Sequence, residues 1–198
     1  MNVSASQVKE LREKTGAGMM DCKRALAESD GDVEKAVDVL RKQGVVKSAK
    51  LGSRVVSQGA VFAYVHPGSQ IGVLVEVDCE TDFVARTADF QALGKNLAMQ
   101  VAAASPVYVS REDVPADLVE REREVLRSQA KAEGKPDRII EKMVEGRLDK
   151  FYQEQCLLDQ PYIRDDARKV KDLVTDAMAK IGENVVVRRF ARFQIGTK

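Results

Sequence analysis

Apolar residues recur at helical spacing through the first fifty positions of the chain, and turn-forming residues interrupt them twice. Ser4 followed by Gln7 is a capping-box pattern at the start of the first apolar stripe. T-G-A-G at 15–18 separates the first two stripes, Asp32 can cap the third, and Gly44 is expected to end it. The apolar members of the three predicted helices are Val8 and Leu11, then Met19, Cys22 and Leu26, then Val33, Ala36, Val37 and Leu40.

Three helices of this length predict a compact bundle, which resembles ubiquitin-associated domains. A small helical subdomain without that relationship fits the pattern equally well. The sequence therefore predicts a first domain at residues 1–50, and a core and dimerisation domain over residues 51–198. Residues 45–58 mix small, basic and apolar side chains and are expected to form a linker with some helix.

Alternation with period two replaces helical spacing in the next segment. Residues 60–65 and 71–79 form two such runs, and Pro67 and Gly68 lie between them, which predicts a β-hairpin. A further run at 185–195 interleaves apolar residues with arginine and predicts another strand.

Helical patterns fill most of the remaining chain. They cover residues 88–103, 116–133, 137–154 and 165–180. The second and third are highly charged, which is typical of a solvated face or of two helices packed along a thin apolar seam. The predicted fold class is α+β: an N-terminal three-helix bundle, then a small antiparallel sheet packed with helices, including a long charged helical pair.

Composition excludes several classes of function. The 32 Lys and Arg residues nearly balance 31 Asp and Glu residues. The resulting net charge of +1 does not give the large positive charge expected of a protein whose main role is to bind nucleic acid. His66 is the only histidine, so a site with several His ligands is impossible. We expect no resident metal and no cofactor.

The sequence also indicates a compartment. The N-terminus mixes acidic and basic residues without the apolar stretch of a secretory signal, and the longest apolar runs are too short to span a bilayer. Cys22, Cys79 and Cys156 are widely spaced and odd in number, which is typical of reduced thiols. We expect a cytoplasmic protein that does not insert in a membrane.

Enzyme motifs are weak throughout. Neither a P-loop nor an H-E-x-x-H motif is present, and G-A-G-M-M-D at 16–21 lacks the third glycine of a dinucleotide loop. Cys79 ends a predicted strand and is the best candidate nucleophile, but Asp78 and Glu80 would raise the pKa of its thiol. We therefore expect a buried structural cysteine, no catalytic residue and no enzyme.

The last predicted strand combines basic and aromatic residues in a pattern that can bind nucleic acid. Arg188, Arg189 and Arg192 interleave with Phe190 and Phe193, an arrangement that can follow a single nucleic-acid strand. One face of the strand must pack inward, however, so an amphipathic edge strand with solvated arginines is favoured, and we expect no direct nucleic-acid partner.

E-T-D-F-V-A-R at 80–86 joins a buried-type strand to an amphipathic helix. In one interpretation Thr81 or Asp82 caps a turn while Phe83 and Val84 pack on the core. In the other, the loop presents an acid and an aromatic side chain on a rigid support, which suits the pocket of a partner protein. Residue types alone favour the first.

Several motifs together resemble the elongation factor Ts family, in that family's order and over essentially the whole chain. They are T-G-A-G-M-M-D-C-K-R-A-L at 15–26, V-D-C-E-T-D-F-V-A-R at 77–86, E-K-M-V-E-G-R at 141–147, Q-P-Y at 160–162 and I-G-E-N-V-V-V-R-R at 181–189. Long motifs in register are far more specific than a single short one, so the resemblance favours the second interpretation of the loop.

The resemblance implies guanine-nucleotide exchange on elongation factor Tu, the GTPase that delivers aminoacyl-tRNA in translation elongation. It implies that Thr81, Asp82, Phe83 and Val84 disturb the Mg²⁺ and phosphate site of the GTPase so that GDP leaves, with Phe83 as an apolar wedge. Such a role makes no change in covalent bonds.

The same resemblance implies that the N-terminal bundle docks on the nucleotide-binding domain of elongation factor Tu. The matching positions are Arg12, Met19, Met20 and Lys23, although Met20 also suits a helical core. Longer family members carry two core modules and this chain has one set of core motifs, so a homodimer through the sheet or the charged helices is expected. The rival interpretation is an adaptor that binds a helical or ubiquitin-like partner through residues 1–50.

Overall fold

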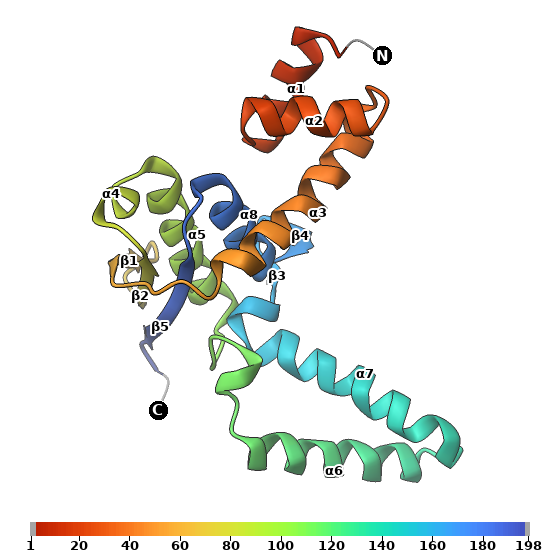
Figure 1. Cartoon of the computed structure of the whole chain (residues 1–198). Helices are drawn as coiled ribbons and strands as arrows, with labels where there is room; N and C mark the ends of the chain where they lie inside the picture. Colours follow the sequence, from red (N-terminus) through yellow and green to blue (C-terminus); the bar gives the residue numbers. More distant parts are fainter. Residues whose placement is uncertain (1–2, 197–198) are drawn as a thin grey trace. The chain divides into compact units, whose positions relative to one another are not determined.

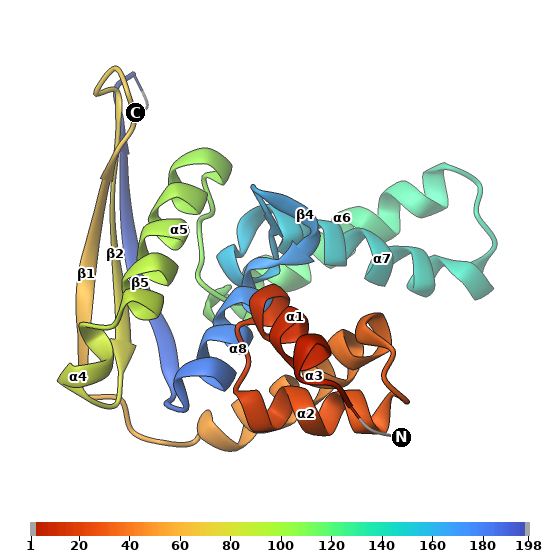
Figure 2. The same cartoon turned by 90° about the horizontal axis from the view of Figure 1, so that it is seen from above.

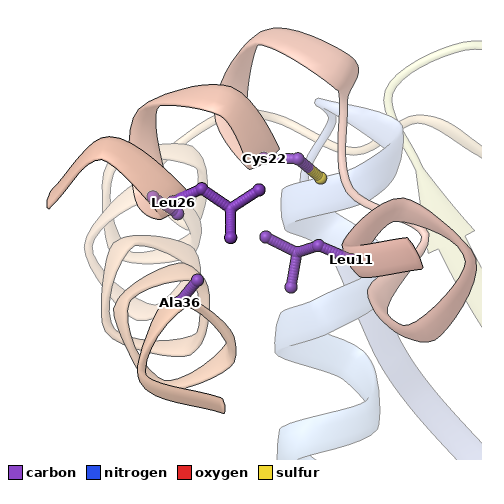
Figure 3. Close-up of a cluster of buried hydrophobic side chains, with 5 residues drawn as sticks. Leu11, Cys22, Leu26 and Ala36 are labelled. Carbon is purple, nitrogen blue, oxygen red and sulfur yellow. The ribbon is translucent and has the colours of Figure 1, made fainter. Parts of the chain in front are cut away.

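The first three helices meet along their apolar faces. The computed structural model describes residues 3–196, and its N-terminal part consists of α1 (Ala5–Thr15), α2 (Met19–Glu28) and α3 (Val33–Leu51). Ser4 forms the predicted capping box with Gln7. The buried core of the bundle consists of Leu11, Cys22, Ala25, Leu26 and Ala36, and the labelled side chains point toward one another in Figure 3. The bundle is thus confirmed, whereas its likeness to ubiquitin-associated domains stays a prediction.

The third helix is longer than predicted. It does not end at Gly44 but continues to Leu51. A glycine ends a helix when the backbone there turns left-handed, but Gly44 lies within the helix and is buried against α8 (Val170–Ile181), where an added Cβ would lie 3.6 Å from Ala179 Cβ. Lys47 Nζ donates a hydrogen bond to the Ala179 carbonyl at 2.6 Å. Tertiary contacts therefore extend the helix past its weakest residue.

A three-stranded sheet follows the bundle. Its strands are β1 (Gln58–Val65), β2 (Ile71–Cys79) and β5 (Val185–Gln194), in the order β1-β2-β5. The His66 amide bonds the Ile71 carbonyl, and the Ile195 amide bonds the Gln70 carbonyl, so both neighbours of β2 run antiparallel to it. Figure 2 shows the three strands beside α5 (Ala88–Ala104).

The charged segment forms a helical hairpin. Its helices are α6 (Ala116–Ala132) and α7 (Asp137–Gln155), which lie side by side in Figure 1. The seam between them consists of Leu126, Ala130, Ile140, Val144 and Leu148. Ion pairs flank the seam, among them Arg127 with Glu141 and Arg147 with Glu133, both at 2.8 Å. The predicted helical pair is confirmed.

A second, two-stranded sheet was not predicted. It pairs β3 (Pro161–Tyr162) with β4 (Asp165–Lys169) in antiparallel register. The predicted helix over 165–180 is therefore wrong in its first five residues, because α8 begins only at Val170. D-D-A-R-K has no apolar stripe of its own, and pairing with β3 decides its conformation.

The chain divides into two compact units, and each contains segments distant in sequence. Among the described residues, the first unit consists of 3–60, Val77–Gly94 and Asp172–Val186, and the second consists of Val61–Glu76, Lys95–Lys171 and 187–196. Helices and small antiparallel sheets together confirm the α+β fold class. The assignment of separate roles to residues 1–50 and 51–198 stays a prediction. No helix within residues 3–196 combines the length and apolar character needed to cross a membrane.

Candidate functional site

The segment after β2 forms a tight turn that presents Phe83. Thr81 is the N-cap of α4 (Asp82–Ala85), and its side-chain oxygen accepts a hydrogen bond from the Val84 amide at 3.3 Å. The side chain of Ala85 is buried, which anchors the end of this single turn on the first unit. Phe83 projects from the middle of the turn and is 79% exposed.

The exposure of Phe83 bears on one part of the two interpretations of this loop, the placement of its side chain. The interpretation that packs Phe83 on the core is wrong, because its side chain is exposed, whereas Val84 is half-buried. A large apolar side chain that is mostly in water contributes little to the stability of the isolated chain. Burial of such a side chain against another protein contributes about 2–3 kcal/mol to the free energy of binding. Phe83 on the loop (residues 80–84) is therefore accessible to a partner protein, and the assignment of Thr81, Asp82, Phe83 and Val84 to such a contact stays a prediction.

Polar contacts fix the backbone on both sides of Phe83. Asp82 forms an ion pair with Arg86 across the turn, at 2.8 Å between Oδ2 and the guanidinium. The Arg86 amide also bonds the Phe83 carbonyl at 3.2 Å. The carboxylate of Glu183, in the connection between α8 and β5, bonds the backbone of Thr81. The sequence pattern predicts no role for Glu183, although the I-G-E-N motif that contains it is part of the resemblance to the elongation factor Ts family.

The predicted docking residues of the bundle all lie on its surface. Met19 and Met20 begin α2 and are 59% and 66% exposed, so the alternative that placed Met20 in the core is wrong. Lys23 is exposed one turn later on the same helix, and Arg12 is exposed on α1. These four residues and the loop belong to different elements of the same compact unit. Two flexible methionines beside a lysine suit an adaptable contact with a protein surface.

Cys79 lacks the surroundings of a nucleophile. Its side chain is fully buried, and its thiol donates a hydrogen bond to the Thr81 carbonyl at 3.2 Å. Burial raises the pKa of the Cys79 thiol, and the negative charges of Glu183 and Asp78 raise it further. The reactive thiolate is therefore disfavoured, as the sequence predicts for a structural cysteine.

Arg189 and Arg192 of the last strand contact groups of the same chain through their guanidinium groups. Arg189 forms an ion pair with Glu76 at 2.6 Å. The Arg192 guanidinium donates hydrogen bonds to the Ala102 carbonyl at 3.1 and 3.3 Å. These contacts fit the interpretation of β5 as an amphipathic edge strand. Residues 3–196 contain no group of three or more His, Cys, Asp or Glu side chains arranged to hold a metal ion.

Comparison with known proteins gives one consistent result. A family model described as elongation factor Ts matches residues 32–197. A protein of Moorella thermoacetica named elongation factor Ts is 58% identical over 194 residues, which are 98% of this chain and 96% of that protein. A protein of the same name from Caldanaerobacter subterraneus is 58% identical, over 98% of this chain and 97% of its own length. A third, from Heliobacterium modesticaldum, is 59% identical over 98% of this chain and 90% of its length.

Proposed function

Because the chain belongs to the elongation factor Ts family and so has a role in translation elongation, we propose that it is a guanine-nucleotide exchange factor for elongation factor Tu. In this proposal it binds the GTPase with GDP, disturbs the Mg²⁺ and phosphate site, and releases the nucleotide. No covalent bond is made or broken. The single observation that carries the proposal is the exposed Phe83 on a loop whose backbone is fixed by its neighbours.

The mechanism follows from linkage between two binding events. A P-loop GTPase holds GDP through a phosphate cradle and Mg²⁺. An exchange factor that binds the distorted cradle more tightly than the intact one weakens GDP by the same free energy. Each ~1.4 kcal/mol of that preference corresponds to a tenfold change, and burial of one aromatic side chain supplies more than this. Phe83 can act as the wedge, Asp82 can hold the turn through Arg86, and Thr81 and Val84 complete the turn.

The bundle supplies the docking surface in this proposal. Met19, Met20, Lys23 and Arg12 would bind the nucleotide-binding domain of elongation factor Tu, while the loop acts on the Mg²⁺ site. Their exposure supports the assignment, since none of the four is used in the core of the bundle. Docking and distortion would then depend on different side chains of one compact unit.

A homodimer is the second part of the proposal, and the outer face of the sheet supports it. Along β1, Val61 and Val65 alternate with the buried Phe62, so they lie on the opposite face of the sheet. Leu74 on β2 and Phe193 on β5 are also exposed, at 48% and 69%. Four exposed apolar side chains within the second unit form a surface that a second copy of the chain can cover.

Displacement of fluorescent GDP from purified elongation factor Tu tests the exchange function. The full chain is expected to accelerate GDP release, and Phe83→Ala is expected to abolish most of that acceleration. Because Phe83 is 79% exposed, the variant should keep the free energy of unfolding within about 0.5 kcal/mol of the native chain. Val55→Ala, which truncates another exposed apolar side chain of the same unit, serves as the matched control and should release GDP at the native rate.

The results separate the proposal from its rival. Native stimulation by Phe83→Ala would contradict the role of the wedge but leave exchange itself standing. A native chain that does not bind elongation factor Tu would contradict the exchange function. That outcome would favour an adaptor that uses the exposed methionines of the bundle for a different protein partner.

A further inference from the structure

The backbone just before Phe83 is bonded by a carboxylate that lies 102 positions later in the sequence. Glu183 Oε2 accepts hydrogen bonds from the amides of Glu80 and Thr81, at 3.2 and 3.1 Å. Its Oε1 accepts a hydrogen bond from the Thr81 hydroxyl at 2.7 Å. One side chain therefore satisfies three donors at the start of the loop, and bonds to an ionised acceptor are roughly twice as strong as neutral ones.

The bonding between the two segments is reciprocal. Glu80 Oε1 accepts a hydrogen bond from the Asn184 amide at 2.6 Å. The Asn184 side chain, only 3% exposed, donates to the carbonyls of Gly52 and Arg54 at 3.3 and 2.7 Å. Three segments of the first unit are thus joined by polar contacts, so the segment that holds Glu183 is itself anchored.

The Thr81 hydroxyl links Glu183 to α4. It donates its single hydrogen to Glu183 while its oxygen accepts from the Val84 amide at 3.3 Å. The bond to Glu183 therefore directs the hydrogen away from α4 and leaves a lone pair for the helix. A four-residue helix is far too short to be stable alone, so its position depends on this cap at its start and on the buried Ala85 at its end. Phe83, exposed to solvent, has little core packing to orient its ring.

We propose that Glu183 is the positioning residue of the loop: acting through Thr81, it holds Phe83 in the orientation in which the ring enters the partner. This inference rests on the exchange function proposed above. Loss of Glu183 leaves the docking residues of the bundle in place, whereas the partner must then order the loop itself. The rate of GDP release at saturation is therefore expected to fall more than the affinity for the partner.

Titration of full-length variants against elongation factor Tu with fluorescent GDP tests this role. For Glu183→Ala we expect the maximal release rate to fall about tenfold or more, and the half-saturating concentration to change less than about threefold. Glu183→Gln keeps the shape of the side chain and one acceptor oxygen, so its maximal release rate is expected to fall less than that of Glu183→Ala. Asp172→Ala is the matched control, because it removes a carboxylate that pairs with Arg41 at 3.4 Å in the same unit, away from the loop; it should keep both values.

Cys79 reports on the loop independently of exchange. Its buried thiol bonds the Thr81 carbonyl, so a loosened loop exposes it to iodoacetamide. In Glu183→Ala we expect faster labelling of Cys79, located by peptide mass spectrometry, while Cys22 in the bundle core stays protected. Labelling of Cys22 as well would reveal general unfolding of Glu183→Ala. The maximal release rate of Glu183→Gln would then be the test of the positioning role.

The outcomes separate this inference from the function on which it rests. A maximal release rate in Glu183→Ala equal to that of the native chain overturns the positioning role, even if Cys79 is labelled faster. A loss of affinity without a loss of maximal rate also overturns it, since Glu183 would then contribute to docking. A native chain that does not release GDP overturns the exchange function, and the role of Glu183 with it.

Discussion

Gly59, the second residue of β1, has a backbone conformation that residues with a side chain rarely adopt. Its φ is 155°, and an added Cβ would lie 2.8 Å from the Asp78 Cα and closer still to the Val77 carbonyl oxygen. Both neighbours are backbone atoms of β2, so no side chain can rotate away to make room. The close approach of the two strands at this point therefore requires glycine.

We expect Gly59→Ala to destabilise the chain by about 3 kcal/mol or more, because the new methyl group forces β1 and β2 apart. Gly72→Ala, in the neighbouring strand, is the control. An added Cβ there meets no atom within 4 Å, and its φ is not positive, so the change should be within about 0.5 kcal/mol of neutral. Urea unfolding followed by circular dichroism measures both, and equal midpoints for the two variants would contradict this account.

Single residues also show which side-chain positions apolar spacing can predict and which it cannot. Leu11, Cys22 and Leu26 were placed in a core by their spacing, and the structure buries all three. Spacing could not decide whether Met20 or Phe83 is buried, because an apolar side chain suits both a core and an interface. Glu183 was missed because its partners lie more than 100 positions away, and a lone glutamate gives no local signal.

At the scale of helices and strands, the side chain of Arg111 holds the base of the α6–α7 hairpin. Arg111, in a short 3₁₀ helix (Arg111–Asp113), donates two hydrogen bonds to the Asp159 carboxylate at 2.8 and 2.9 Å. It also bonds Asp149 on α7 at 2.9 Å, and its guanidinium lies 4.6 Å from the ring centroid of Tyr152. One side chain therefore joins α7 to the segments on either side of the hairpin.

This contact predicts a dependence of stability on pH. Burial raises the pKa of the Asp159 carboxyl, but the hydrogen bonds and charge of Arg111 outweigh it and hold that pKa below its ordinary value. The lowered pKa stabilises the fold at pH values above ~4, where the unfolded carboxyl is already ionised. That contribution is lost as the pH falls through the folded pKa, because the carboxyl must then be protonated.

Asp159→Asn isolates this contribution. At neutral pH we expect the variant to be less stable by about 2 kcal/mol, since it loses the charge-assisted bonds between the buried Asp159 carboxylate and the partly exposed Arg111 guanidinium. The difference between variant and native chain should shrink as the pH falls below ~4, where the native carboxyl also loses its charge. Urea unfolding at several pH values measures the difference, and one that stays constant down to pH ~2 would contradict the assignment.

Elements with strong local patterns were predictable, and those set by pairing were not. The helices of the charged hairpin and the strands β1 and β2 follow from apolar periodicity within each segment. The β3–β4 pair has no such signal, because it is set by backbone pairing between the two segments, with Pro161 opposite Lys169, and not by a pattern of side chains within either strand. The extension of α3 past Gly44 likewise depends on α8, which is far away in sequence.

At the scale of the whole molecule, the compact units do not follow the order of the chain. The first unit combines the bundle with residues 77–94 and 172–186, so it contains the proposed docking residues, the loop and Glu183 together. Local patterns predicted a boundary near residue 50, because they report where helices give way to strands. They do not report which distant segments join one unit, and this is why the relation between the bundle, the loop and Glu183 came only from the structure.

The second unit carries the surface on which the proposed dimer depends. Val61, Val65, Leu74 and Phe193 lie exposed on β1, β2 and β5, whereas Val125 and Ile139 are exposed on the charged hairpin, at 45% and 37%. These two surfaces correspond to the two interfaces that the sequence left open. In a dimer with two-fold symmetry each residue of the interface is buried twice, so a substitution there counts twice.

Phe193→Glu therefore tests the sheet, and Val125→Glu tests the hairpin. Burial of one phenylalanine contributes about 2 kcal/mol, so loss of two of them weakens a symmetric dimer by about 4 kcal/mol, or roughly a thousandfold in the dissociation constant. We expect the native chain and Val125→Glu to sediment as dimers at micromolar concentration, and Phe193→Glu as a monomer. Dissociation by Val125→Glu alone would place the interface on the charged helices, and a monomeric native chain would contradict the dimer altogether.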